Sequence, residues 1–277
     1  VNGVSYATLA DAINAAKDGE TVNMLASTVC TENTDLTEVK SVTVDFAQHT
    51  FTGDNKNIAI RSKAEGAGVL TLMNGTITTG DGTYCTLGAA NGSAIVVKDM
   101  ILNNSTAFGG SVKAFPGGTI ELRDSQLNSV KGGGVAAAGG TVNIYNSKID
   151  QKEYYDWNSM IAAASNGTGV VNIYGGEFTS ENYGLYIFTS GGTINVYDGT
   201  FTVRGDKPVL KADLDLGSYP NAVAEINISG GTFVGGIDMA KNENVHLNIT
   251  GGTFSVDPNA YCATGYLSLI HISEPTR

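Results

Sequence analysis

Two stretches near the end of the chain carry the same pattern. Residues 226–233 read Ile-Asn-Ile-Ser-Gly-Gly-Thr-Phe, and residues 247–254 read Leu-Asn-Ile-Thr-Gly-Gly-Thr-Phe. Apolar side chains two residues apart lie on one face of a β-strand, so the asparagine between them faces the opposite way. Gly-Gly permits the positive φ angles of a sharp bend, and Thr-Phe then returns an aromatic side chain to the interior. The pattern predicts two short strands joined by a tight turn.

The same pattern recurs along most of the chain at intervals of 21 to 32 residues. The closing apolar residues are Ile77, Ile101, Leu127, Ile149, Phe178, Phe201, Phe233 and Phe254. The apolar pairs that precede them are Leu70 and Leu72, Ala94 and Val96, Ile120 and Leu122, Val142 and Ile144, Val171 and Ile173, Ile194 and Val196, Ile226 and Ile228, and Leu247 and Ile249. The mean interval of about 25 residues is typical of a solenoid. One such repeat cannot bury its own apolar side chains, whereas stacked repeats can.

The predicted fold is therefore all-β, a single-stranded right-handed parallel β-helix of about 10 coils. Asparagines hold the outward position of the repeat, and in register they would hydrogen-bond from coil to coil as a structural ladder. They are Asn143, Asn172, Asn195, Asn227 and Asn248. A β-sandwich is the competing fold. It predicts hairpins every 8–12 residues or so and no long-range repeat, which disfavours it here.

A short helix is predicted before the first coil, within residues 8–19. Thr8 can cap it, and Leu9 and Ile13 lie on one apolar stripe, so the helix would cover the open end of the core. No equivalent cap is visible in the sequence after Phe254. We therefore expect a solenoid that is closed at its N-terminal end and truncated at its C-terminal end.

The chain divides into a capping segment (1–20), a solenoid (21–266) and a tail (267–277). The tail reads Leu-Ser-Leu-Ile-His-Ile-Ser-Glu-Pro-Thr-Arg, contains no glycine and breaks the repeat. It resembles the in-frame translation of a transposase adaptor used in sequencing libraries. We exclude it from the fold and expect the solenoid to belong to a longer, multidomain chain.

Composition and charge fit this architecture and narrow the possible partners. The 277 residues include 36 Gly, 29 Thr and 24 Asn, which favours short strands and turns over helices. A net charge of −11 disfavours nucleic acid and anionic lipid as partners. No apolar run is long enough to insert into a membrane. Cys30, Cys85 and Cys262 are far apart in the sequence, so neither a metal site nor a redox site is indicated.

Three segments carry a resemblance to a known family. Residues 6–22 (Tyr-Ala-Thr-Leu-Ala-Asp-Ala-Ile-Asn-Ala-Ala-Lys-Asp-Gly-Glu-Thr-Val) resemble the opening of pectate-lyase-like β-helix domains in surface proteins of gut bacteria. Residues 44–51 resemble an early coil of that superfamily, and residues 249–258 resemble its closing coils. The resemblance implies a right-handed β-helix in an extracellular, adhesin-like protein. It does not imply an activity, because the fold hosts lyases, hydrolases, adhesins and phage tailspikes.

The set of catalytic motifs of that superfamily is incomplete in the sequence, so we regard an enzyme as uncertain and lean against it. Of the four strings typical of its hydrolases, Asp-Asp and His-Gly do not occur, whereas Asn-Thr-Asp (33–35) and Arg-x-Lys (61–63) do. The alternative function is a polysaccharide lyase or glycoside hydrolase. Its carboxylates would come from Asp150, Glu153, Asp156 and Glu181.

Ligand binding is the leading hypothesis, and it rests on the two longest repeats. Insertions in a solenoid map to one face, which is often the binding face. The predicted ligand-binding residues are Tyr154, Tyr155, Trp157, Tyr183 and Tyr186, because aromatic side chains stack on sugars and anchor protein contacts. These rings could instead cover the apolar edge of the solenoid. Asp213 and Asp215 are weak candidates for a calcium site, and no other cofactor is expected.

The sequence thus predicts a non-catalytic, extracellular β-helix segment of a bacterial adhesin-like protein, at the cell surface or secreted. It would bind a glycan or a host surface protein through loop insertions on one side. A polysaccharide-degrading enzyme and a purely structural stalk are the two alternatives.

Overall fold

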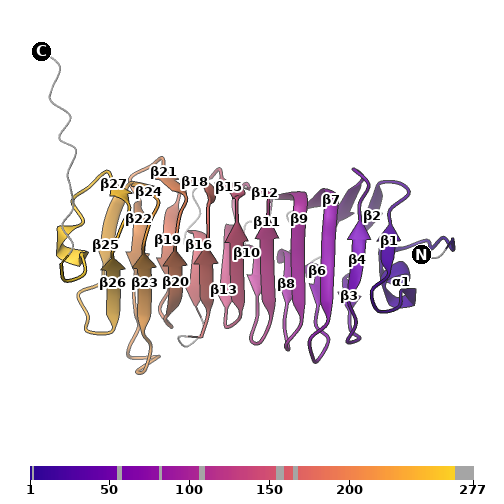
Figure 1. Cartoon of the computed structure of the whole chain (residues 1–277), viewed down its shortest axis with the longest axis horizontal. Coiled ribbons are helices and arrows are strands. Elements are labelled where there is room, and N and C mark those ends of the chain that lie inside the picture. Colours follow the sequence, from indigo (N-terminus) through magenta and orange to yellow (C-terminus); the bar gives the residue numbers. More distant parts are fainter. Residues whose placement is uncertain are drawn as a thin grey trace, which may run out of the picture.

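The computed structural model describes residues 1, 3–54, 58–80, 83–105, 110–153, 159–164 and 168–265. They form an elongated parallel β-solenoid of about nine turns, with the N-terminal helix at one end and the last coils at the other (Figure 1). The predicted all-β solenoid with a short N-terminal helix is confirmed, and its number of turns is close to the ten expected. No helix in the described residues has the length and apolarity to span a bilayer.

Each complete coil contributes three strands, and every strand pairs in parallel with its equivalents in adjacent coils. The first ladder contains β1 (Thr21–Asn23), β4 (Val42–Asp45), the first parts of β7 (Val69–Thr79) and β9 (Ala94–Asn104), β11 (Thr119–Arg123), β14 (Thr141–Tyr145), β17 (Val170–Ile173), β20 (Gly192–Val196), β23 (Ala224–Ile228) and β26 (Val245–Ile249). The second contains β2 (Thr28–Cys30), β5 (Thr50–Gly53), the last parts of β7 and β9, β12 (Gln126–Ser129), β15 (Ser147–Gln151), β18 (Gly176–Ser180), β21 (Thr200–Val203), β24 (Thr232–Val234) and β27 (Thr253–Phe254).

The third ladder is a separate sheet of nine strands in the described chain. It contains β3 (Thr34–Leu36), β6 (Ile58–Ser62), β8 (Cys85–Ala89), β10 (Gly110–Ala114), β13 (Gly133–Ala138), β16 (Ser159–Ala164), β19 (Tyr183–Ile187), β22 (Pro208–Ala212) and β25 (Gly236–Met239). The first two ladders instead join into one 18-stranded sheet, because β7 and β9 continue through the bend between them.

The bend between the first and second ladders requires a left-handed backbone. Asn74, Asp124 and Asn146 take φ angles of 61°, 47° and 42° there, which polar Asn and Asp side chains tolerate. Later coils use glycine instead. A Cβ on Gly176 (φ 136°) would lie 2.1 Å from the carbonyl oxygen of Ser147 in the coil below. The turn-forming pairs in the sequence therefore mark where each coil changes direction.

The interior is built from stacked identical or similar side chains. Phe178, Phe201, Phe233 and Phe254 stack with ring centroids 4.7–4.8 Å apart. Offset stacking of this kind adds to the burial of apolar surface. A continuous core therefore runs along the rod beneath all three ladders.

One coil differs from the sequence prediction by a single residue. The repeat placed Ala94, Val96 and Ile101 inside, whereas the structure buries Ile95, Val97 and Leu102 completely and leaves Ile101 43% exposed. The cause is Asp99, which takes the left-handed bend position (φ 53°). Leu70 then pairs with Ile95, and Ile77 pairs with Leu102. A one-residue slip moves every side chain of a strand to the opposite face.

Both ends of the described rod carry additional structure. The helix α1 (Leu9–Ala15) is capped by Thr8, whose Oγ1 accepts a hydrogen bond from the backbone N–H of Asp11 at 3.0 Å. Lys40 donates to the carbonyl oxygens of Asn14 and Ala16 at 2.8 and 2.9 Å and so ties the helix to the solenoid. At the other end, the 3₁₀ helix η1 (Asn259–Tyr261) lies against β26, a partial cover that the sequence pattern did not reveal.

Candidate functional site

The predicted asparagine ladder forms the outer face of the first ladder, which we call the asparagine face. The Nδ2 of Asn172 donates to the Oδ1 of Asn143, and each later asparagine donates in the same way to the one before it. The four N···O distances are 2.9, 2.9, 3.0 and 2.9 Å for Asn172, Asn195, Asn227 and Asn248 as donors. This row is a structural device, because each amide satisfies its neighbour.

The outer face of the third ladder, the variable face, does not repeat. Its central register row contains a different residue type in most coils. In order along the rod the row is Asp35, Arg61, Gly88, Lys113, Ala136, Ala162, Tyr186, Lys211 and Asp238. Stacking does not demand such variation, so chemistry specific to this protein is best sought on this face.

Aromatic and charged side chains gather on the variable face at β19, β22 and β25. We call this cluster the tyrosine–lysine patch. It consists of Tyr183, Tyr186, Phe188, Lys207, Lys211, Asp213 and Asp238. The coil register brings them together, since Tyr186 pairs with Lys211 and Lys211 pairs with Asp238.

Tyr186 is the buried centre of the patch. It is only 4% exposed, and its ring centroid lies 5.0 Å from that of Tyr183 and 4.0 Å from that of Phe188. Its hydroxyl donates to the Oδ2 of Asp213 at 3.1 Å. Burial and the negative charge of Asp213 both raise the pKa of Tyr186, so the phenol stays protonated at neutral pH. Tyr186 therefore supports the patch and does not present its ring to a ligand.

Lys211 links the charges of the patch. Its Nζ lies 2.7 Å from Asp238 and 2.9 Å from Asp213, with the side chain 13% exposed. Burial alone would lower the pKa of Lys211, but the hydrogen bonds to Asp238 and Asp213 outweigh it and raise that pKa. The Nζ atoms of Lys207 and Lys211 each lie 5.7 Å from the centre of the Tyr183 ring. Two lysines and two aspartates balance, so the patch is locally neutral on a chain of net charge −11.

The predicted ligand-binding residues have different outcomes. Tyr154, Tyr155 and Trp157 lie outside the described residues. Tyr183 lies at the partly exposed rim of the patch, whereas Tyr186 is buried within it. The sequence prediction missed Phe188, Lys207, Lys211 and Asp238. The repeat found in the sequence covers only the first two strands of each coil, so it gave no register that would place Lys211 beside Tyr186.

The two calcium candidates are not brought together. Asp213 is engaged with Tyr186 and Lys211, as above. Asp215 is exposed and accepts hydrogen bonds from the backbone N–H groups of Gly217 and Ser218. The hydrogen bond from the Ser218 side chain, followed in size by that from its backbone N–H, holds the pKa of Asp215 below the ordinary value. Within the described residues no three potential metal ligands cluster.

Two of the acids considered for catalysis lie on either side of Arg204. The guanidinium is 2.9 Å from the Oδ1 of Asp150 and 3.2 Å from the Oε1 of Glu181. Burial would raise the pKa of Asp150, but hydrogen bonds from Thr179 and Arg204 outweigh it and lower that pKa. Asp150 is therefore ionised at neutral pH and suited to accept a hydrogen bond, not to donate a proton to a leaving group.

The other two acids do not both fall within the described residues. Glu153 is exposed, and Asp156 lies outside the described residues. The pKa of Arg204 is raised, first by its hydrogen bond to Asp150, so the guanidinium remains charged and cannot act as a base. In the described chain this cluster has the geometry of surface ion pairs.

Comparisons with protein-family models, with curated proteins and with solved structures found no match.

Proposed function

We propose that this chain is a non-catalytic β-helix segment of a bacterial cell-surface protein and binds a protein partner through the tyrosine–lysine patch. Outside the cell, the segment would act as a stiff rod that presents its variable face sideways. The likeness of residues 6–22 to the opening of surface β-helix domains supports this setting. The patch supports the binding role.

The observation that carries the proposal is the composition of the patch. A half-buried tyrosine ring is surrounded by paired charges that neutralise one another. Protein interfaces are enriched in tyrosine, and their charged groups are usually paired at the rim. A sugar would need an open aromatic face, but Tyr186 is buried and two lysines lie over Tyr183. The patch therefore favours a protein over a glycan.

The test probes the full chain for binding to arrays of purified host extracellular proteins. Arrays of glycans and mucins test the competing hypothesis of a carbohydrate ligand. The patch variant is Tyr183→Ala. Loss of the partly exposed tyrosine ring of the patch is expected to weaken binding by about tenfold or more. The matched control is Tyr197→Ala, which removes a 49% exposed tyrosine from the asparagine face.

Binding to a defined protein that falls with Tyr183→Ala and not with Tyr197→Ala would support the proposal. Binding confined to glycans would replace the protein partner with a carbohydrate. Absence of binding on every array would leave only the role of a structural stalk. Product release from pectins or alginate would show an enzyme and reject a non-catalytic segment.

A further inference from the structure

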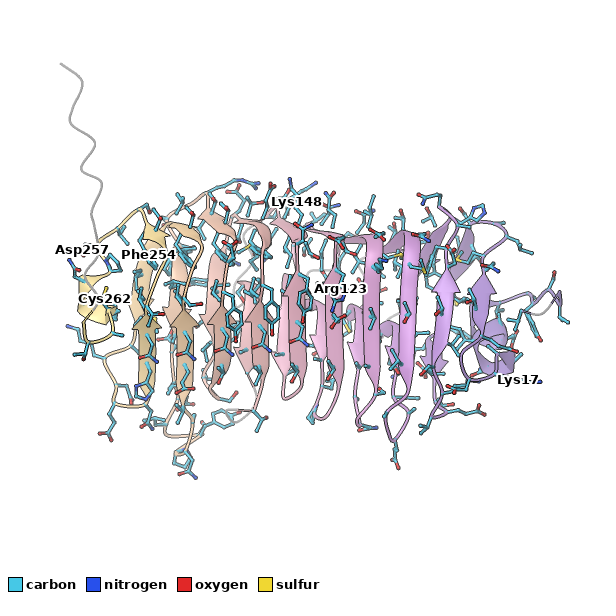
Figure 2. All side chains as sticks on the ribbon, in the orientation of Figure 1. Lys17, Arg123, Lys148, Phe254, Asp257 and Cys262 are labelled. Atoms are coloured by element: carbon cyan, nitrogen blue, oxygen red, sulfur yellow. The ribbon has the colours of Figure 1, made fainter. Side chains whose placement is uncertain are left out.

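A row of stacked tyrosines runs along the asparagine face, beside the asparagine ladder. The ring centroids of Tyr145 and Tyr174 are 4.5 Å apart, those of Tyr174 and Tyr197 are 4.9 Å apart, and the planes differ by only 4° and 5°. The guanidinium of Arg123, labelled in Figure 2, lies 4.0 Å from the Tyr145 centroid. Arg123 therefore closes the row at its N-terminal end.

The other end of the row is open. In the next two coils the same register position holds Ser229 and Thr250, both exposed. One face of Tyr197 packs against Tyr174, and the opposite face looks over these two short side chains. Two coils at about 4.8 Å each leave a ledge nearly 10 Å long, enough for one six-membered sugar ring.

Hydrogen-bonding groups line this ledge. Asn227 and Asn248 lie two residues before Ser229 and Thr250, so their side-chain amides lie along one side of the ledge. The ladder uses one N–H of each amide, and a carboxamide has two. The hydroxyls of Ser229 and Thr250 donate to backbone carbonyls at 3.2 Å, which leaves their oxygens able to accept. The ledge thus combines an apolar ring face with donors and acceptors.

From this geometry we infer a binding site for one neutral hexopyranose, which stacks its C–H face on the free face of Tyr197 over Ser229 and Thr250. Aromatic rings present a negative face that attracts polarised C–H groups. Asp198 directly follows Tyr197 in the chain, and Glu225 lies two residues before Asn227. Their negative charges disfavour uronic acids as ligands. The site is separate from the tyrosine–lysine patch and does not depend on the proposed protein partner.

The test is saturation-transfer NMR of the full chain with methyl galactopyranoside and methyl glucopyranoside. We expect millimolar affinity for at least one of them, transfer strongest to the ring C–H protons, and at least tenfold weaker binding of methyl glucuronide. The inference would be overturned if neither neutral glycoside bound at about 50 mM, which is far above a dissociation constant of about 1 mM.

Two variants separate this site from any other. Ser229→Ile fills the ledge and should abolish binding. Tyr197→Ser removes the ring on which the sugar stacks and should weaken binding at least tenfold. The control Thr253→Ile enlarges an exposed residue on the second ladder and should change nothing. Full binding by Ser229→Ile, or loss of binding in the control with its fold intact by circular dichroism, would refute the assignment.

Tyr183→Ala distinguishes this site from the patch. We expect it to leave glycoside binding unchanged, whatever it does to binding of a protein partner. A parallel loss of glycoside binding would place the sugar on the variable face and contradict the inference.

Discussion

The asparagine face and the variable face are built by the same coils but differ in their outer side chains. One repeats asparagine over five coils and bonds each amide to the next. The other changes from Ala162 to Tyr186 to Lys211 in three successive coils. Identical polar side chains at the spacing of adjacent strands satisfy each other, so repetition stabilises the stack. The face that does not repeat is free to differ coil by coil, so a cluster such as the tyrosine–lysine patch can form there.

The largest expected effect tests whether the two faces differ only on their outer sides. Ile194 lies beneath the asparagine face and Leu210 beneath the variable face, and both are fully buried. Either residue changed to Ala should lower the free energy of unfolding by about 2–5 kcal/mol, because it leaves a cavity. Urea denaturation measures both midpoints. A loss below about 1 kcal/mol for Leu210→Ala alone would show that the core beneath the variable face is not equivalent.

The next effect breaks the asparagine ladder itself. Asn195→Ala removes one hydrogen bond to Asn172 and one from Asn227. At about 0.5–1.5 kcal/mol each, the loss should be about 1–3 kcal/mol. The matched variant is Lys113→Ala on the variable face, which loses an exposed contact with Tyr84 and should cost at most about 1 kcal/mol. Equal urea midpoints for the two variants would contradict the structural role of the ladder.

A smaller effect tests the centre of the tyrosine–lysine patch. Tyr186→Phe keeps the ring and removes the hydroxyl that donates to Asp213. We expect about 1 kcal/mol of lost stability, because one hydrogen bond to a charged, partly exposed acceptor is removed. Thermal unfolding measures this loss. Tyr183→Phe is the control, and its stability should match that of the unaltered chain.

The smallest effect concerns pH and also separates the faces. On the variable face, burial would raise the pKa of Asp35, but hydrogen bonds and charges from Arg61 and Lys63 hold it below 3.8. A depressed pKa stabilises the fold above the unfolded value of 3.8, and this contribution is lost as the pH falls through the folded pKa. The stability gap between the unaltered chain and Asp35→Asn should therefore shrink below pH 3.8.

Titration of urea midpoints from pH 6 to pH 2 measures this gap. Asn195→Ala is the reference, since its stability deficit involves only neutral amides and should change little over that range. A gap for Asp35→Asn that grows as the pH falls would contradict the ion pair as its source.

Local chemistry explains why so much of the fold could be predicted. The alternation around Asn227 and Asn248 defines strands, and the Gly-Gly pairs define bends, because both depend on neighbouring residues alone. The same reasoning located the helix behind Thr8. It failed at Asp99, where an aspartate occupies a bend position that glycine or asparagine holds in most other coils. Pattern alone does not distinguish a bend aspartate from a strand residue.

The sequence by itself determined the repeat, the solenoid, most of the buried residues and the asparagines that form the outward row, since these follow from periodicity. Only the tertiary structure decided which distant residues meet. Tyr186 and Lys211 are 25 positions apart, and the stacking of coils places them side by side and buries a ring that the sequence offered as a binding residue. The open face of Tyr197 arises in the same way, because Ser229 follows it in register 32 residues later. Contacts between coils depend on the lengths of all the intervening turns, and a local sequence pattern does not contain that information.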